Sequence, residues 1–198
     1  MPIPNQDAVK PVLDTVRDQI LGAVRGAWED WQGSEQSVTW RVKRSRANFV
    51  WEQIIDRAHR AFAEMRHVVI IDGGESFRFL VQDEVLFRFK KADETGRTSN
   101  VSTQLALAFH DHDQGLFGLP EVQRVEVVYK LNRLETSVSD ICVVARDGDK
   151  VVWEYSLLDA AEVIVPLPFP APAIDPEKPA VRLVKAREAP APKRKQQD

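Results

Sequence analysis

The spacing of apolar residues divides the chain into a helical first part and a strand-rich second part. Over residues 7–32, apolar side chains recur every three or four positions, as an amphipathic helix requires. Pro11 fits only the first turn of such a helix. The same spacing over residues 48–65 predicts a second helix. Residues 37–45 alternate apolar and polar side chains, so that both a short strand and an extended linker stay open there.

From residue 67 onward the apolar period changes to two, which predicts strands. Residues 67–72 form an apolar run that ends in a turn sequence. Residues 76–82 and 84–91 then alternate on either side of a polar turn, as the two arms of a hairpin do.

The two faces of this hairpin differ in chemistry. Alternation places Phe77 and Phe79 opposite Phe87 and Phe89 on one face, where we expect aromatic cross-strand pairs. The other face is basic and carries Arg78, Arg88 and Lys90.

The remaining pattern predicts one inserted helix and three more strands. Ser99 or Asn100 can cap a helix up to residue 111, and strands are expected at residues 124–132, 139–146 and 150–157. The dipeptide Asp147-Gly148 is a strong hairpin signal between the last two strands. One face of the final strand is expected to carry Val151, Trp153, Tyr155 and Leu157.

The predicted fold is α+β, with N-terminal amphipathic helices followed by a mostly antiparallel sheet of five to six strands. We divide the chain into a helical region, 1–66, a sheet domain with its inserted helix, 67–160, and a proline-rich basic tail, 161–198. Alternating prolines from Pro166 to Pro172 favour an extended backbone, and we expect the tail to be largely disordered.

Composition narrows the range of functions. A hydrophobic content of 43% over 198 residues is enough for a core, and the net charge of −3 does not by itself indicate nucleic acid or a membrane. The single cysteine, Cys142, excludes an internal disulfide and fits a reducing cytosol. Because no apolar run is long enough to span a bilayer and no signal pattern opens the chain, we expect a cytoplasmic protein.

The stretch from His110 to Asp113, HDHD, is the best candidate for a metal site. Histidines two positions apart point the same way on a strand but diverge on a helix. Because His110 and His112 lie at the end of a helical pattern, we interpret them as helix C-terminal residues and predict neither a metal nor another cofactor.

Other nucleophile and phosphate signals are weak. Cys142 lies in an apolar strand and is interpreted as a core residue. The turn at residues 72–76 lacks the lysine and hydroxyl of a phosphate-binding loop. The sequence therefore predicts no catalytic residues.

Basic and aromatic residues are better candidates for binding. A first basic cluster comprises Arg41, Lys43, Arg44 and Arg46, and a second surrounds the first hairpin. A solvated surface and a phosphate-binding surface both fit these clusters. Trp28 and Trp31 occupy the end of the first predicted helix, where they are either core residues or contacts for a partner protein.

A resemblance adds a candidate partner. The segments VLFRFKKADETGRTSNVSTQLALAF, GLFGLPEVQRVEVVYKLN and KVVWEYSL, between Val85 and Leu157, resemble a group of bacterial proteins of about this size. Genes of that group often lie beside a helix-turn-helix regulator fused to an ImmA/IrrE-type metallopeptidase-like domain, as in toxin–antitoxin and phage-defence modules. The resemblance implies a partner protein, and it carries over no catalytic residue.

Together, these observations favour a non-enzymatic protein that binds a cognate regulator of a two-gene module. The predicted contact residues are Trp28, Trp31, Arg41, Lys43, Arg44, Arg46, Arg78, Arg88 and Lys90. The alternative is a nucleic-acid-binding protein, or an RNA-directed toxin that uses the basic hairpin face and His110 with His112. The role as toxin or antitoxin and the oligomeric state stay open.

Overall fold

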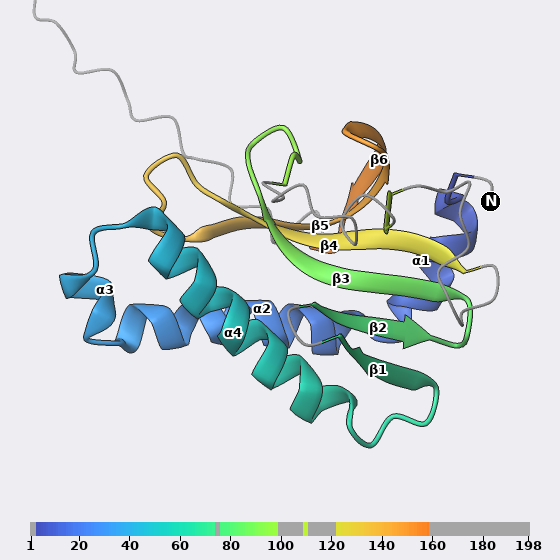
Figure 1. The fold of residues 1–198 in the computed structure, drawn as a ribbon, viewed down its shortest axis with the longest axis horizontal. Helices are drawn as coiled ribbons and strands as arrows, with labels where there is room; N and C mark the ends of the chain where they lie inside the picture. The colour runs from blue at the N-terminus through green and yellow to red at the C-terminus, as the bar shows by residue number, and fades with distance from the viewer. Residues whose placement is uncertain (1–2, 74–75, 99–108, 111–121, 159–198) are drawn as a thin grey trace, which may run out of the picture. The chain divides into compact units, whose positions relative to one another are not determined.

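A computed structural model describes residues 3–73, 76–98, 109–110 and 122–158. Within these residues four helices precede six strands, so that the α+β fold class expected from the sequence is confirmed (Figure 1). The elements are α1 (Gln6–Asp14), α2 (Arg17–Gly33), α3 (Gln36–Thr39), α4 (Lys43–Phe62), β1 (Val68–Asp72), β2 (Phe77–Val81), β3 (Val85–Ala92), β4 (Gln123–Leu131), β5 (Val138–Asp147) and β6 (Lys150–Ser156).

The strands form one sheet in which spatial order follows sequence order, from β1 to β6. All neighbouring strands pair antiparallel except β3 and β4, which run parallel with Val85 opposite Gln123 and Arg88 opposite Glu126. A parallel pair needs a long crossover connection, and the inserted helix was expected in that connection. Most of the predicted helix lies outside the described residues, but Phe109 and His110 have helical backbone.

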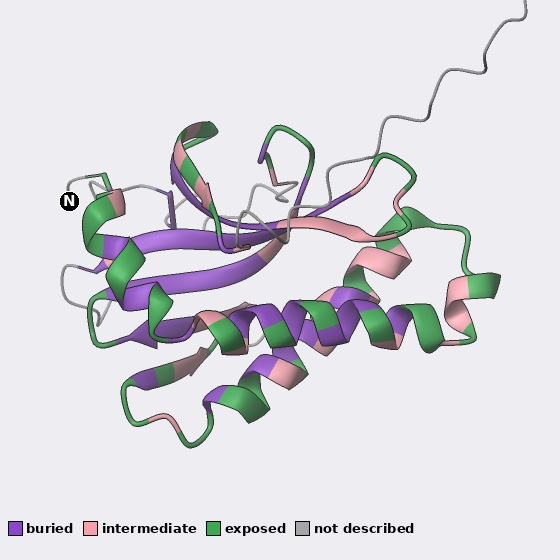
Figure 2. Ribbon diagram, turned by 180° about the vertical axis from the view of Figure 1, so that it is seen from behind, coloured by how far each residue is buried: buried purple, intermediate pink, exposed green. Residues whose placement is uncertain are grey.

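The main core lies between one face of the sheet and the helices α1, α2 and α4, as the burial colours of Figure 2 show. The expected aromatic pair of the first hairpin is confirmed, because Phe79 lies opposite Phe87 with ring centroids 5.2 Å apart. Phe62 of α4 packs against Phe79 at 5.3 Å. These contacts fix the helices to the sheet through buried aromatic area.

The single helix expected over residues 7–32 is in fact two helices. The break falls at Thr15 and Val16, between α1 and α2. Pro11 lies inside α1 and not in its first turn. An interior proline removes one intrahelical hydrogen bond and crowds the carbonyl four residues before it, which agrees with a helix that ends soon afterwards.

Residues 37–45, expected to be a strand or an extended linker, instead contain α3 and the first turn of α4. Val38 is 86% exposed and Val42 is 62% exposed, so their alternation does not bury one side of a strand. Helix α4 also begins at Lys43, five residues before the expected start.

The last hairpin is confirmed, with Asp147 opposite Lys150 and a positive φ of 55° at Gly148. The expectation that Val151 shares one face of β6 with Trp153, Tyr155 and Leu157 is wrong. The register shifts between Ala145 and Arg146, and Val151 packs against a small cluster on the sheet face away from the helices. A bulge adds one residue to a strand, and this reverses the side on which later side chains lie.

Candidate functional site

A groove of about 450 Å³ opens where the end of α2, α3, the start of α4 and the loop between β4 and β5 meet. We call it the aromatic groove, and its lining residues are Trp28, Trp31, Gln32, Ser37, Trp40, Arg41, Val42, Lys43, Arg46, Leu134, Glu135 and Thr136. Five of the nine predicted contact residues therefore line one groove, namely Trp28, Trp31, Arg41, Lys43 and Arg46.

The aromatic wall of the groove is built by ring contacts between helices. The Trp31 ring lies 5.4 Å from Phe49 of α4 in an edge-on contact and 6.2 Å from Trp40. The backbone N–H of Trp40 donates to the carbonyl of Gln36 at 2.8 Å, which holds Trp40 at the end of α3. The short helix α3 thus brings Trp40 into contact with Trp31 of α2.

The three tryptophans do different things in this wall. Trp28 and Trp31 are each only 6% exposed and belong to the main core, whereas Trp40 is 45% exposed. Trp28 and Trp31 therefore lie beneath the groove surface, and Trp40 is the one of the three that exposes a wide area to solvent.

Exposed apolar side chains gather at the rim of the groove. The described residues include seven exposed large hydrophobic residues, and three of them, Trp40, Val42 and Leu134, line the groove. Leu134 is 80% exposed. Exposed apolar residues that gather in one place mark binding sites more often than scattered ones do.

The loop between β4 and β5 is held against the helices by polar contacts. Gln32 Nε2 of α2 donates to the carbonyl of Thr136 at 3.1 Å. Asn132 stabilises the loop internally, because its Oδ1 accepts from the N–H of Thr136 at 2.8 Å and its carbonyl accepts from the N–H of Glu135. Leu134 is thereby presented next to the aromatic wall.

Glu135 is the acidic residue of the groove and lies among cations. Its carboxylate accepts from Arg46 and pairs with Lys43 at 3.2 Å and with Lys91 at 3.4 Å. The hydrogen bond from Arg46 is the main cause that lowers the pKa of Glu135 to about 2. Three cations and one carboxylate line the groove, which leaves its rim positive.

The remaining predicted contact residues lie elsewhere. Arg44 is exposed on the first turn of α4 but does not line the groove. Arg78, Arg88 and Lys90 belong to β2 and β3, and their alternation with the core phenylalanines places them on the sheet face away from the helices. The expectation of an open basic hairpin face is wrong for Arg88, which is 7% exposed.

Arg88 belongs to a buried polar cluster, which we define as Arg88, Thr98, His110, Glu126 and Arg146. Arg88 donates to Glu126 Oε1 from Nη2 at 2.7 Å and from Nε at 3.0 Å. Thr98 Oγ1 donates to Glu126 Oε2 at 3.1 Å and accepts from Arg146 Nη1 at 3.1 Å. Both oxygens of a fully buried carboxylate are therefore satisfied.

His110 joins this cluster through its Nε2 atom, which lies 2.8 Å from Arg88 Nη2. The same Nε2 atom lies 3.4 Å from Glu126 Oε1, so His110 contacts both members of the Arg88–Glu126 pair. Burial by itself raises the pKa of Glu126, but hydrogen bonds from His110 and Arg88 and the charge of Arg88 outweigh it and bring the pKa to about 2. The cluster holds an ionised carboxylate inside the protein.

The HDHD stretch can be followed only in part. His110 is 8% exposed and contacts Arg88, whereas Asp111, His112 and Asp113 lie outside the described residues. Within the described residues, no group of three or more histidine, cysteine or acidic side chains is arranged to hold a metal ion.

Cys142 lies in β5 and is 1% exposed, as expected for a core residue. Its thiol donates to Asp140 Oδ2 at 2.9 Å, and burial raises its pKa. A thiol that stays protonated is a poor nucleophile.

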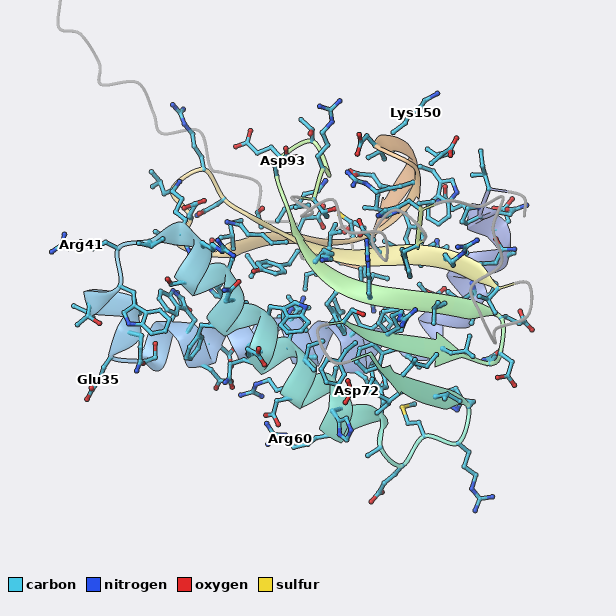
Figure 3. All side chains as sticks on the ribbon, viewed as in Figure 1. Glu35, Arg41, Arg60, Asp72, Asp93 and Lys150 are labelled. Carbon is cyan, nitrogen blue, oxygen red and sulfur yellow. The ribbon has the colours of Figure 1, made fainter. Side chains whose placement is uncertain are left out.

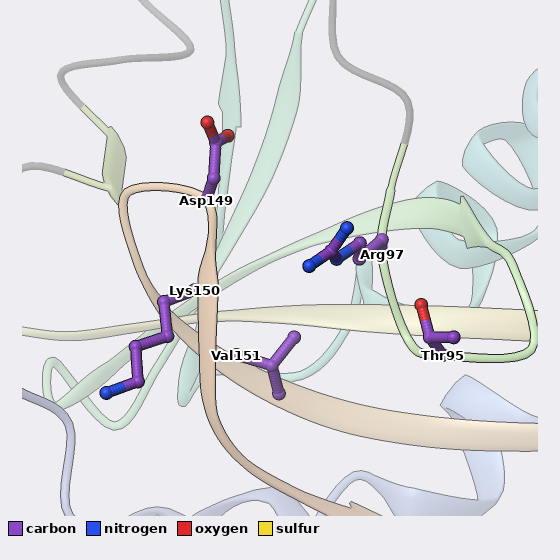
Figure 4. A pocket seen from close by; sticks show the side chains of 5 residues that line it. All are labelled: Thr95, Arg97, Asp149, Lys150 and Val151. Carbon is purple, nitrogen blue, oxygen red and sulfur yellow. The ribbon is translucent and has the colours of Figure 1, made fainter.

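A second hollow, of about 640 Å³, lies between the β3–β4 connection and the β5–β6 hairpin (Figure 4). It is lined by Thr95, Arg97, Asp149, Lys150 and Val151. Val151 is the one apolar residue in this lining, so no apolar side chains gather there as they do at the aromatic groove.

Some residues of the aromatic groove and of the buried polar cluster were not predicted from the sequence. Leu134 and Glu135 lie in a polar turn, where an isolated leucine between charged residues was the available signal. Glu126 occupies the polar phase of a strand, but its pairing with Arg88 depends on a parallel register that the sequence did not reveal.

No protein-family model matches the chain, no curated protein is similar to it, and no solved structure matches it. None of the helices in the described part of the chain is long and apolar enough to cross a membrane.

Proposed function

We propose that this chain is a protein-binding component of a bacterial two-gene module and that it binds a cognate regulator protein through the aromatic groove. One observation carries the proposal: exposed apolar side chains and basic side chains that are separated in sequence converge on this groove.

The packing beneath the groove supports a binding role. Trp28 and Trp31 are buried and Gln32 fixes the facing loop, so that the exposed surface of Trp40 and Leu134 rests on a rigid base. Aromatic residues in such preorganised positions dominate the energy of protein interfaces, since little entropy is lost when they are covered.

The segment from Val85 to Leu157 resembles a group of bacterial proteins, and this resemblance suggests which partner to test. Proteins of that group are often encoded beside a helix-turn-helix regulator with an ImmA/IrrE-type domain, in the manner of toxin–antitoxin and phage-defence modules. In that arrangement the regulator would more naturally be the antitoxin, and whether this chain is the toxic or the neutralising member stays open.

The test is binding of the adjacent regulator to the full chain and to groove variants. Leu134→Ser removes an exposed side chain and is expected to weaken binding about tenfold or more without unfolding the protein. Val69→Ser, in β1, is the matched control because Val69 is 49% exposed and does not line the groove. Equal affinity of both variants, or no complex between two folded proteins at micromolar concentration, would contradict the proposal.

A second candidate function, an RNA-directed toxin, is favoured by one specific contact. His110 lies against Arg88 and Glu126, which are residue types that serve as acid, base and phosphate ligand in RNA cleavage. The described residues of this cluster are largely buried. The cluster would therefore have to open before an RNA substrate could reach it.

This second function is tested by growth arrest on expression of His110→Ala and of a variant that also lacks His112. Loss of toxicity with an intact fold and intact regulator binding would support the nuclease. Unchanged toxicity would exclude both histidines from the chemistry.

A further inference from the structure

We infer that the aromatic groove recognises an acidic segment of its partner that carries large apolar side chains, and this inference rests on the proposed function. The groove combines an exposed apolar rim with an excess of cations, and these two features together specify the chemistry of the segment.

The apolar part of the groove selects side chains, not a large flat surface. Its volume of about 450 Å³ is in the lower part of the range of pockets that take small ligands. Trp40, Val42 and Leu134 contribute apolar surface around it. This space suits one or two leucine or aromatic side chains from a short segment.

The charged part of the groove selects acidic neighbours for those side chains. Arg41 is exposed and projects outward from the connection between α3 and α4 (Figure 3). Lys43 exposes 77% of its side chain. Glu135, the acidic lining residue, is already engaged with Arg46 and two lysines, so a basic segment would meet repulsion that an acidic one would not.

Nucleic acid is negatively charged, as an acidic peptide segment is, but it fits the groove less well than such a segment does. Binding of single-stranded RNA uses several exposed aromatic rings on which successive bases stack. Here Trp28 and Trp31 are buried in the wall, and Trp40 alone of the lining tryptophans exposes much of its ring. A rim of valine and leucine side chains suits the anchors of a peptide better than it suits bases.

The experiment measures the fluorescence anisotropy of three labelled synthetic peptides with the full chain. The first peptide alternates glutamate and aspartate with leucine and phenylalanine, the second replaces its acids by lysine, and the third replaces its apolar residues by serine. We expect the first to bind about tenfold or more tightly than either of the others, and to weaken as salt rises. Equal binding of the first two peptides, or no binding of the first, would overturn the inference.

Charge variants of the groove provide the second arm. Arg41→Glu combined with Lys43→Gln should weaken the acidic peptide and strengthen the lysine peptide. Lys150→Glu combined with Lys10→Gln makes the same change in net charge at exposed positions outside the groove and should leave both affinities unchanged. An equal effect of the two double variants would overturn the inference, since a general field would then explain the binding.

Competition and assembly state separate the other possible occupants. An unlabelled oligouridine that displaces the acidic peptide as well as the unlabelled peptide does would assign the groove to nucleic acid and overturn the inference. A dimer of this chain that dissociates in Leu134→Ser would assign the groove to a second copy. If the regulator binds through the groove but the acidic peptide does not, the inference fails while the proposed function stands.

Discussion

The aromatic groove and the buried polar cluster use the same residue types in opposite ways. In the groove, apolar side chains are exposed and the cations Arg41 and Lys43 reach solvent. In the cluster, Arg88 and Glu126 are enclosed and neutralise one another. A basic residue can therefore be taken as part of a binding surface only once its place in the fold is known.

The largest expected effect is on stability, from breaking the buried cluster. Glu126→Leu removes the carboxylate that compensates buried Arg88, and we expect the free energy of unfolding to fall by about 3–5 kcal/mol. Urea denaturation measures this change. The double variant Glu126→Leu with Arg88→Met should recover much of the loss, and a single variant that costs under about 1 kcal/mol would show that the cluster is not tightly coupled.

The next effect is on binding, from truncating the groove. Trp40→Ala is expected to reduce affinity for the regulator by about 2 kcal/mol or more in calorimetric titration, because Trp40 provides the exposed aromatic surface there. Its contacts with Trp31 and Phe49 also stabilise the helices, so thermal denaturation must accompany the titration. Affinity equal to wild type in a folded Trp40→Ala protein would remove this residue from the interface.

Replacement of Glu135, the acidic residue of the groove, is expected to have a smaller effect on the free energy of unfolding, and this effect depends on pH. The pKa of Glu135 is about 2 in the folded protein and 4.5 ordinarily, so the unfolded chain takes up the proton first as pH falls. The stabilising contribution is therefore complete above about pH 4.5 and is lost as the pH falls towards 2. Glu135→Gln should cost about 1 kcal/mol at pH 7 and almost nothing at pH 2. A pH-independent difference between the two proteins would contradict this assignment.

The smallest expected effect concerns the exposed cations themselves. Arg41→Ala and Arg44→Ala should change the free energy of unfolding by less than about 0.5 kcal/mol, because both residues are exposed. In binding they should differ, since Arg41 lines the groove and Arg44 does not. Regulator binding that weakens equally in both variants would argue for a diffuse basic surface in place of the groove.

The sheet could be predicted from the sequence because its physical signal is local. Strict alternation placed Phe79 opposite Phe87, and Asp147-Gly148 fixed the last hairpin. Where a local signal was ambiguous, packing decided. The alternation over residues 37–45 allowed a strand or an extended linker, but no strand of the described residues pairs with it, and α3 instead brings Trp40 into contact with Trp31.

The groove could be predicted only in its parts. Trp28, Trp31 and the cluster from Arg41 to Arg46 were visible as candidate contacts, but Leu134 and Glu135 reach them through a loop distant in sequence. The burial of Arg88 depended on the parallel pairing of β3 with β4, which no periodicity encodes. Local chemistry was therefore readable, and the long-range contacts that sort surface from interior were not.

Hydrogen–deuterium exchange of the full chain with and without the cognate regulator tests whether the aromatic groove is the binding surface. We expect that bound regulator slows exchange in the backbone around α3, the first turn of α4 and residues 132–137, which surround the aromatic groove. Slowed exchange confined to β2 and β3, with the groove unchanged, would contradict this expectation.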